Sequence, residues 1–231
     1  MKDLYLIIFP TILAVAHIIG SSSRIPKLKR AVDIEAFSAG FSIAYVFVVL
    51  IPEIFRINPV EDPRWPMLFI LAGFSFFHVS LRFVYVRLLN ANKSLLSEVI
   101  HIGAMATFSL VLAYSVTELI NTNFGEGIVL LVFAVVHIVL SEIWENREFN
   151  NNELAGVRPM IMILATMLGG VLSIASVISR HVTTGLYAFA AGALVYIAIR
   201  EELPVENTSR PIFFLLGAFS IVITFLVISL L

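Results

Sequence analysis

Long apolar runs, separated by short polar stretches, make up most of this chain. A helix that crosses a bilayer needs about 20 mainly apolar residues, and eight runs approach that length. They are approximately Leu4–Gly20, Ile34–Pro52, Pro66–Leu89, Leu95–Ile120, Gly127–Trp144, Pro159–Ser179, Thr184–Ile199 and Pro211–Leu231. Turn residues mark the short connections, so consecutive helices are expected to be antiparallel neighbours. The pattern predicts an all-α integral membrane protein with eight transmembrane helices, forming a single transmembrane domain over residues 1–231.

Two of these runs carry the same motif. Phe37-Ser38-Ala39-Gly40 leads a run that ends at Pro52-Glu53, and Phe189-Ala190-Ala191-Gly192 leads another that ends at Pro204, with 12 positions from Gly to Pro in both. Counting spans, the first run crosses the membrane in one direction and the second in the other. Inverted repeats of this kind build the central site of many secondary transporters. We interpret the motif as the trace of a duplication.

Basic residues near the ends of spans indicate which side is cytoplasmic. The first, third, fifth and seventh connections together carry ten Lys and Arg, whereas the other face carries four. The odd-numbered connections are therefore predicted to be cytoplasmic, with both termini outside. This arrangement is that of a multi-pass protein of the cell membrane.

Composition excludes several classes of function. Hydrophobic residues make up 59% of the chain and charged residues 13%, whereas soluble domains carry about 25% charged residues. The net charge of −1 and the absence of a basic stripe give no site for nucleic acid. The chain has no Cys, which removes thiolate chemistry, and no nucleophile motif indicates an enzyme. The expected partner is the lipid bilayer, and no cofactor is expected.

Polar residues inside the predicted spans are the candidates for function, because ionisable groups in a membrane are costly. The candidates are His17, His78, Arg82, Glu98, His101, His137, Ser141, Glu142 and Glu145. By depth, those of the central helices fall in the inner half of the membrane and are expected to form one cluster. Imidazoles and carboxylates converging from two helices can hold a divalent cation such as Zn, Mn or Fe. The alternative is a structural set of hydrogen bonds and ion pairs around Arg82.

The repeat, the topology and the two central helices with His resemble those of the ZIP (Zrt/Irt-like) divalent metal transporters over nearly the whole chain. In that family the second helix reads like Phe37-Ser38-Ala39-Gly40…Leu50-Ile51-Pro52-Glu53, and the seventh like Phe189-Ala190-Ala191-Gly192…Glu202-Leu203-Pro204. The resemblance implies a 3+2+3 arrangement. Inverted repeats would occupy about 1–90 and 157–231, the central helices 95–146, and the protein would be a homodimer.

The resemblance also implies a metal site on the central helices. Of the family motif on the fourth helix only His101 is present, and the fifth helix keeps His137 and Glu142. The implied site is thus a reduced one of His101, His137 and Glu142, with Glu98, Glu145 and Ser141 as further ligands, and its cargo is a divalent metal such as zinc. Within it, His101 and His137 are expected to face each other. We also expect Arg82 to pair with Glu98 or Glu142, since an unpaired guanidinium at that depth is costly.

Two other functions remain open at this point. One is a transporter of a different solute on the same scaffold, such as a proton-coupled solute or an anion held by Arg82. The other is a ZIP-like membrane protein that transports nothing and uses the cluster of Arg, Glu and His structurally.

Overall fold

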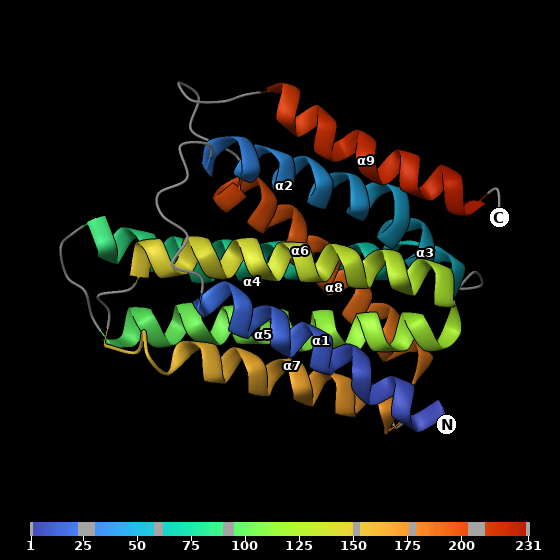
Figure 1. Ribbon diagram of the computed structural model, residues 1–231, viewed down its shortest axis with the longest axis horizontal. Coiled ribbons are helices and arrows are strands. Elements are labelled where there is room, and N and C mark those ends of the chain that lie inside the picture. Colours follow the sequence, from blue (N-terminus) through green and yellow to red (C-terminus); the bar gives the residue numbers. More distant parts are fainter. Residues whose placement is uncertain are drawn as a thin grey trace. The chain divides into compact units, whose positions relative to one another are not determined.

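The computed structural model describes residues 2–22, 31–57, 62–89, 95–149, 153–175, 179–202 and 211–229, which are helical apart from short turns. In chain order the helices are α1 (Lys2–Ser22), α2 (Ala31–Tyr45), the π-helical η1 (Val46–Leu50), α3 (Ile51–Ile57), α4 (Arg64–Leu89), α5 (Leu95–Thr122), α6 (Phe124–Phe149), α7 (Arg158–Ile174), α8 (Arg180–Ile197), the π-helical η2 (Ala198–Glu202) and α9 (Pro211–Ser229) (Figure 1). No strand occurs in these ranges. The all-helical prediction is confirmed.

Each of the eight predicted apolar runs is mainly helical where the structure describes it. The second run is divided among α2, η1 and α3, and the seventh between α8 and η2. Within the described residues, five helical stretches are long and apolar enough to cross a membrane, and three shorter ones are similarly apolar. These lengths and compositions are compatible with a multi-pass membrane protein.

Several helices expose large apolar side chains along one face and bury another. On α7 the exposed positions include Met160, Leu164, Leu168 and Val171, whereas Met162 and Thr166 are buried. The exposed residues recur every three or four positions, which is the period of one helical face. An apolar stripe of this kind is stable against lipid and unusual against water.

The chain forms two compact units. Unit 1 comprises Met1–Ser23 and Ser75–Ile178, and unit 2 comprises Arg24–Phe74 and Ser179–Leu231. Unit 1 therefore contains α1, the second part of α4, α5, α6 and α7. Unit 2 contains α2, η1, α3, the first part of α4, α8, η2 and α9.

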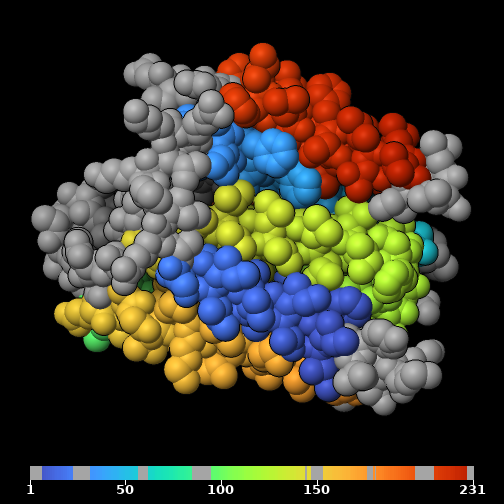
Figure 2. Space-filling model, viewed as in Figure 1, coloured from blue at the N-terminus to red at the C-terminus, as the bar shows by residue number. Residues whose placement is uncertain are grey.

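In unit 1, helix α7 packs closely against both α5 and α1. A Cβ on Gly169 would lie 2.1 Å from the backbone oxygen of Leu110 on α5, and a Cβ on Gly170 would lie 2.2 Å from Pro10 on α1. Both glycines are therefore needed for these helix crossings. Figure 2 shows α1 lying directly on α6 and α7. At the other end of α7, where the candidate site begins, Arg158 is buried.

In unit 2, glycines allow two equally close crossings. Gly40 of α2 and Gly217 of α9 approach each other's helix: their Cβ atoms would lie 2.0 Å from the oxygen of Phe214 and 2.1 Å from that of Phe37. Gly192 of α8 and Gly73 of α4 do the same, at 1.9 Å from the oxygen of Ile70 and 2.1 Å from that of Phe189. Any larger residue would force these helices apart.

Candidate functional site

The buried polar residues of unit 1 gather at one end of its helices. The end of α1, the start of α5, the end of α6 and the start of α7 meet there (Figure 1). They bring together His17 from α1, His101 from α5, Glu142 and Glu145 from α6, and Arg158 from α7, all of them buried. These buried polar groups form one cluster, and its members differ from the predicted set.

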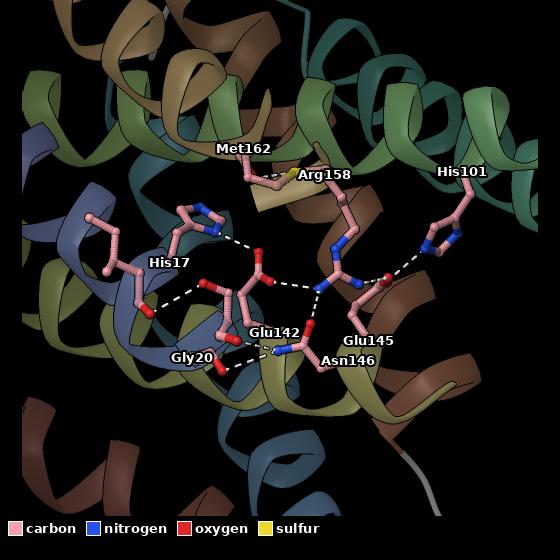
Figure 3. A network of polar contacts seen from close by, with 11 residues as sticks. His17, Gly20, His101, Glu142, Glu145, Asn146, Arg158 and Met162 are labelled. Carbon is pink, nitrogen blue, oxygen red and sulfur yellow. Dashed lines mark hydrogen bonds and ion pairs between the residues drawn. The ribbon is translucent and has the colours of Figure 1, made fainter. Parts of the chain in front are cut away.

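Arg158 is the centre of this network (Figure 3). Its guanidinium donates to Oε2 of Glu142 at 2.9 Å and to Oε2 of Glu145 at 2.8 Å. Glu142 and Glu145 are three residues apart on α6, so both carboxylates project from the same face of the helix. Only 4% of the Arg158 surface is exposed. A guanidinium suits this position because its planar fork of donors can bond two carboxylates at once.

The second oxygen of each carboxylate accepts a hydrogen bond from an imidazole. Nδ1 of His17 lies 2.8 Å from Oε1 of Glu142, and Nε2 of His101 lies 2.7 Å from Oε1 of Glu145. Both contacts are hydrogen bonds in which the ring nitrogen donates. All four carboxylate oxygens thus have a partner. Two carboxylates and one guanidinium leave the network with one formal negative charge when the imidazoles are neutral.

Asn146 connects the network to the last turn of α1. Its Oδ1 accepts from Arg158 at 2.8 Å, and its Nδ2 donates to the backbone oxygen of Ser21 at 2.9 Å. The bond to Ser21 therefore links the Arg158 network to the backbone of α1.

A close approach of α1 and α6 makes the His17 contact possible. A Cβ on Gly20 would lie 2.6 Å from the Cβ of Glu142 and 3.0 Å from the backbone oxygen of Val139. Only glycine fits at this distance. His17 lies three residues before Gly20 on the same helical face, which places its ring against Glu142.

A cavity of about 30 Å³ borders the network inside unit 1. Its lining consists of His17, Met105, Phe108, Ser109, His137, Ile138, Ser141, Glu142, Glu145, Arg158 and Met162. A single water needs about 10–15 Å³ of such space. The cavity is therefore large enough for a small ion or one to two waters.

The ring of His137 is held between two aromatic side chains of unit 1. It is stacked on Phe133 at 5.6 Å between centroids and meets Phe108 edge-on at 5.4 Å. The ring is buried and lines the cavity. His101, in contrast, is not among the residues that line the cavity. The structure thus gives no facing pair of His101 and His137; the imidazoles of His17 and His137 share the cavity instead.

Five of the predicted residues lie outside the network: His137, described above, and Glu98, His78, Arg82 and Ser141. Glu98 accepts from the backbone N–H of Leu154 at 3.0 Å and so binds the turn before α7. His78 and Arg82 are exposed on α4. The prediction that Arg82 would pair with Glu98 or Glu142 is wrong. Glu98 binds backbone N–H groups instead, and Arg158 and His17 occupy the carboxylate of Glu142. Ser141 lines the cavity without joining the ion pairs.

Sequence reasoning missed Arg158, which was counted with the cytoplasmic loop charges. The following residue, Pro159, carries the signal that could have found it. Proline favours the first turn of a helix, so α7 begins at Arg158, whose side chain is buried. A basic residue directly before such a proline, next to a helix that carries two glutamates, is a candidate for a buried ion pair.

The network in this conformation does not present a ready-made site for a divalent metal. The described parts of the chain hold no group of three or more His, Cys, Asp or Glu arranged to bind a metal ion. The carboxylates that a divalent ion would need are bonded to Arg158. The arrangement offers two carboxylates and one guanidinium beside a small cavity, with one formal negative charge when the imidazoles are neutral.

Comparison with protein-family models finds no match, and comparison with curated proteins finds no significant match.

Proposed function

We propose that this chain is a ZIP-like membrane transporter of metal cations, and that the cation passes the Arg158 network and its cavity. The observation that carries the proposal is a buried network of one guanidinium, two carboxylates and two imidazoles beside a cavity in an apolar helical bundle. Buried ion pairs add little stability compared with well-packed apolar side chains. Charged groups inside a membrane bundle typically mark an ion pathway.

The scaffold of the proposal is the inverted repeat of the ZIP-like arrangement. A shift of 152 residues relates Gly40 to Gly192 and also relates η1 (Val46–Leu50) to η2 (Ala198–Glu202). π-Helical segments are rare and are frequently found at functional sites. Their equal placement after the paired glycines supports a duplication. Pro204, the predicted equivalent of Pro52, lies outside the described residues.

The glycine crossings in unit 2 support the same duplication. The partners of Gly40 and Gly192 are Phe214 and Ile70, which are 144 residues apart, and Gly217 and Gly73 are also 144 residues apart. If a three-helix unit was duplicated, each contact between two of its helices should recur between the equivalent helices of the other copy. The equivalent positions should then be separated by constant numbers of residues. Chance placement of four glycines has no reason to preserve both offsets.

The orientation is proposed from the basic connections. They place the end of unit 1 that holds Arg158 on the cytoplasmic side, with both termini outside. A cation in the cavity would then lie in the inner half of the membrane.

For a divalent cargo such as zinc, manganese or iron, the carboxylates of Glu142 and Glu145 are the natural ligands. Such an ion could reach them only in exchange for the guanidinium of Arg158. In this proposal Arg158 holds the carboxylates in place between transport events and competes with the cargo for them.

Transport by the purified full-length protein in liposomes tests the proposal. We expect accumulation of at least one of Zn²⁺, Mn²⁺, Fe²⁺ or Ag⁺ inside the vesicles, measured by mass spectrometry of the metal. Glu142→Gln should reduce the rate, whereas Glu98→Gln, whose carboxylate binds a turn instead, should not. Liposomes that accumulate none of the four ions would overturn the proposal.

A second function is favoured by the complete pairing of the carboxylates. Because Arg158 and the two imidazoles use all four oxygens, the network could serve only to hold α1, α5, α6 and α7 together. This is the non-transporting ZIP-like protein, and absence of transport by a folded, reconstituted protein is its expected result.

A further inference from the structure

The cavity beside the Arg158 network carries soft metal ligands that the network does not use. Met105 from α5 and Met162 from α7 both line it, and both are buried. The hydroxyl of Ser109 donates to the sulfur of Met162 at 3.7 Å and fixes the direction of that side chain. A thioether sulfur has a second lone pair, so Met162 can still bind a metal. Thioethers favour soft ions such as Cu(I) over Zn²⁺ or Mn²⁺.

His17 adds a nitrogen ligand in the orientation that metal sites use. Its Nδ1 donates to Glu142 at 2.8 Å, so in the neutral ring the lone pair is on Nε2. Nε2 is buried and has no hydrogen-bond partner among the described residues. In Figure 3 this nitrogen lies on the side of Met162, and both residues line the cavity. Histidines that bind metals almost always donate their other nitrogen to a carboxylate or carbonyl in this way.

The net charge of the Arg158 network favours a monovalent over a divalent cation in the cavity. Glu142 and Glu145 against Arg158 leave one formal negative charge when the imidazoles are neutral. A monovalent cation makes the buried cluster neutral, with Arg158 in place. A divalent cation would leave an uncompensated positive charge in an apolar bundle, which is costly.

We propose that this cavity binds a soft monovalent metal cation of the Cu(I) and Ag(I) type, held by Nε2 of His17 and the sulfurs of Met105 and Met162. His137, whose ring lines the same cavity, supplies a further nitrogen ligand. The proposal rests on the proposed function and names the class of cargo: a soft monovalent ion that the site accepts without displacing Arg158.

Silver binding to the purified full-length protein in detergent tests this site, in chloride-free buffer. Equilibrium dialysis with metal analysis should give one Ag⁺ per chain, and X-ray absorption should show both sulfur and nitrogen neighbours. The double variant Met105→Leu/Met162→Leu keeps the side-chain volume but removes both sulfurs. We expect it to weaken Ag⁺ binding by at least about tenfold, by analogy with the loss on removing groups at metal sites.

Met160→Leu is the matched control, because Met160 lies on the same helix as Met162 but is 61% exposed. It should bind Ag⁺ as tightly as the unchanged protein. His17→Gln tests the nitrogen ligand, since a glutamine amide still donates to Glu142 but has no imidazole lone pair. It should lose one of the two nitrogen neighbours in the absorption spectrum, because His137 still lines the cavity. If the double Leu variant does not fold, this spectrum decides the question.

The outcomes separate this inference from the proposed function. Stoichiometric Ag⁺ binding that depends on Met105 and Met162, together with no transport of any ion, keeps the site and overturns the transporter. Transport of Zn²⁺ with no Ag⁺ binding overturns the site and keeps the transporter. Ag⁺ binding that is equal in the double Leu variant and in Met160→Leu also overturns the site.

Discussion

At the scale of single residues, Arg158 decides whether the network is stable. Its guanidinium is the cation that both carboxylates of α6 share. Replacing a whole buried ion-pair network by apolar residues is often neutral, whereas removing one partner leaves a buried charge without compensation. A variant that removes only Arg158 measures the free-energy cost of leaving the carboxylates unpaired. A variant that removes all three charges measures the contribution of the whole network to stability.

Arg158→Leu should destabilise the protein by about 3–5 kcal/mol, since Glu142 and Glu145 lose their common partner. The triple variant Arg158→Leu/Glu142→Gln/Glu145→Gln should recover a large part of that loss. Thermal and denaturant unfolding of the purified protein in detergent measures both.

The control for this prediction is Arg82→Leu, because Arg82 is exposed on α4 and its replacement should change stability much less. Equal losses for Arg82→Leu and Arg158→Leu would contradict the assignment of Arg158 as the buried cation.

The sequence predicted which residue types would gather but only part of the network. Glu142, Glu145 and His101 were found because carboxylates and imidazoles inside an apolar run have to seek partners. Arg158 was missed because its place at the end of a polar connection looks like an ordinary loop charge. Arg82 was misassigned because helical spacing does not reveal which helix covers a given face.

At the scale of helices, Gly20 controls how α1 meets α6. The contact of His17 with Glu142 and that of Asn146 with the end of α1 both require the backbones to stay close. A side chain at position 20 would push α1 away and break both bonds at once. The network therefore depends on a residue that takes no part in its chemistry.

Gly20→Ala should destabilise the protein by about 1–3 kcal/mol, the usual cost of overpacking, and reduce Ag⁺ binding through displacement of His17. Gly103→Ala is the matched control, because a Cβ there meets nothing within 4 Å. In the middle of α5 that change should be neutral or stabilise by about 0.5–1 kcal/mol. Unfolding curves and silver dialysis on both variants check this, and a Gly20→Ala protein that matches Gly103→Ala would contradict it.

The helices themselves were predictable because apolar runs of this length have few alternatives in a membrane. The π-helical segments were not, since neither Val46–Leu50 nor Ala198–Glu202 has a local signal such as proline or glycine inside it. The feature that relates the two segments is their equal distance from Gly40 and Gly192.

At the scale of the whole molecule, the proposed duplication predicts that equivalent glycines contribute equally to stability. Gly40 and Gly192 each face a backbone oxygen of another helix at about the same distance. In the proposed repeat, these two helix crossings are equivalent. Their energetic costs should then match.

Gly40→Ala and Gly192→Ala should each destabilise the protein, by about 1–3 kcal/mol, and by similar amounts. Gly185→Ala is the control on α8, because its nearest neighbour is the ring of Phe69 at 3.3 Å, a side chain that can move. Denaturant unfolding compares the three variants. A large loss at only one of the two crossings would contradict the symmetry.

The last prediction concerns the orientation of the whole chain. The cytoplasmic connections were assigned with Arg158 counted among ten basic residues. Arg158 is buried in the network, so nine basic residues remain against four on the other face, and the direction of the bias is unchanged. The end of unit 1 that holds the network is therefore still expected to be cytoplasmic.

Single cysteines can test this directly, because the chain has none of its own. Asn121 lies near the end of α5 and Gly156 in the turn before α7, at opposite ends of unit 1, and both are exposed. A membrane-impermeant maleimide added to intact cells should label Asn121→Cys, and Gly156→Cys only after the cells are opened. The reverse pattern would place the network in the outer half of the membrane. A cation bound there would then meet the Arg158 network on entry from outside, and the positive-inside assignment would be wrong.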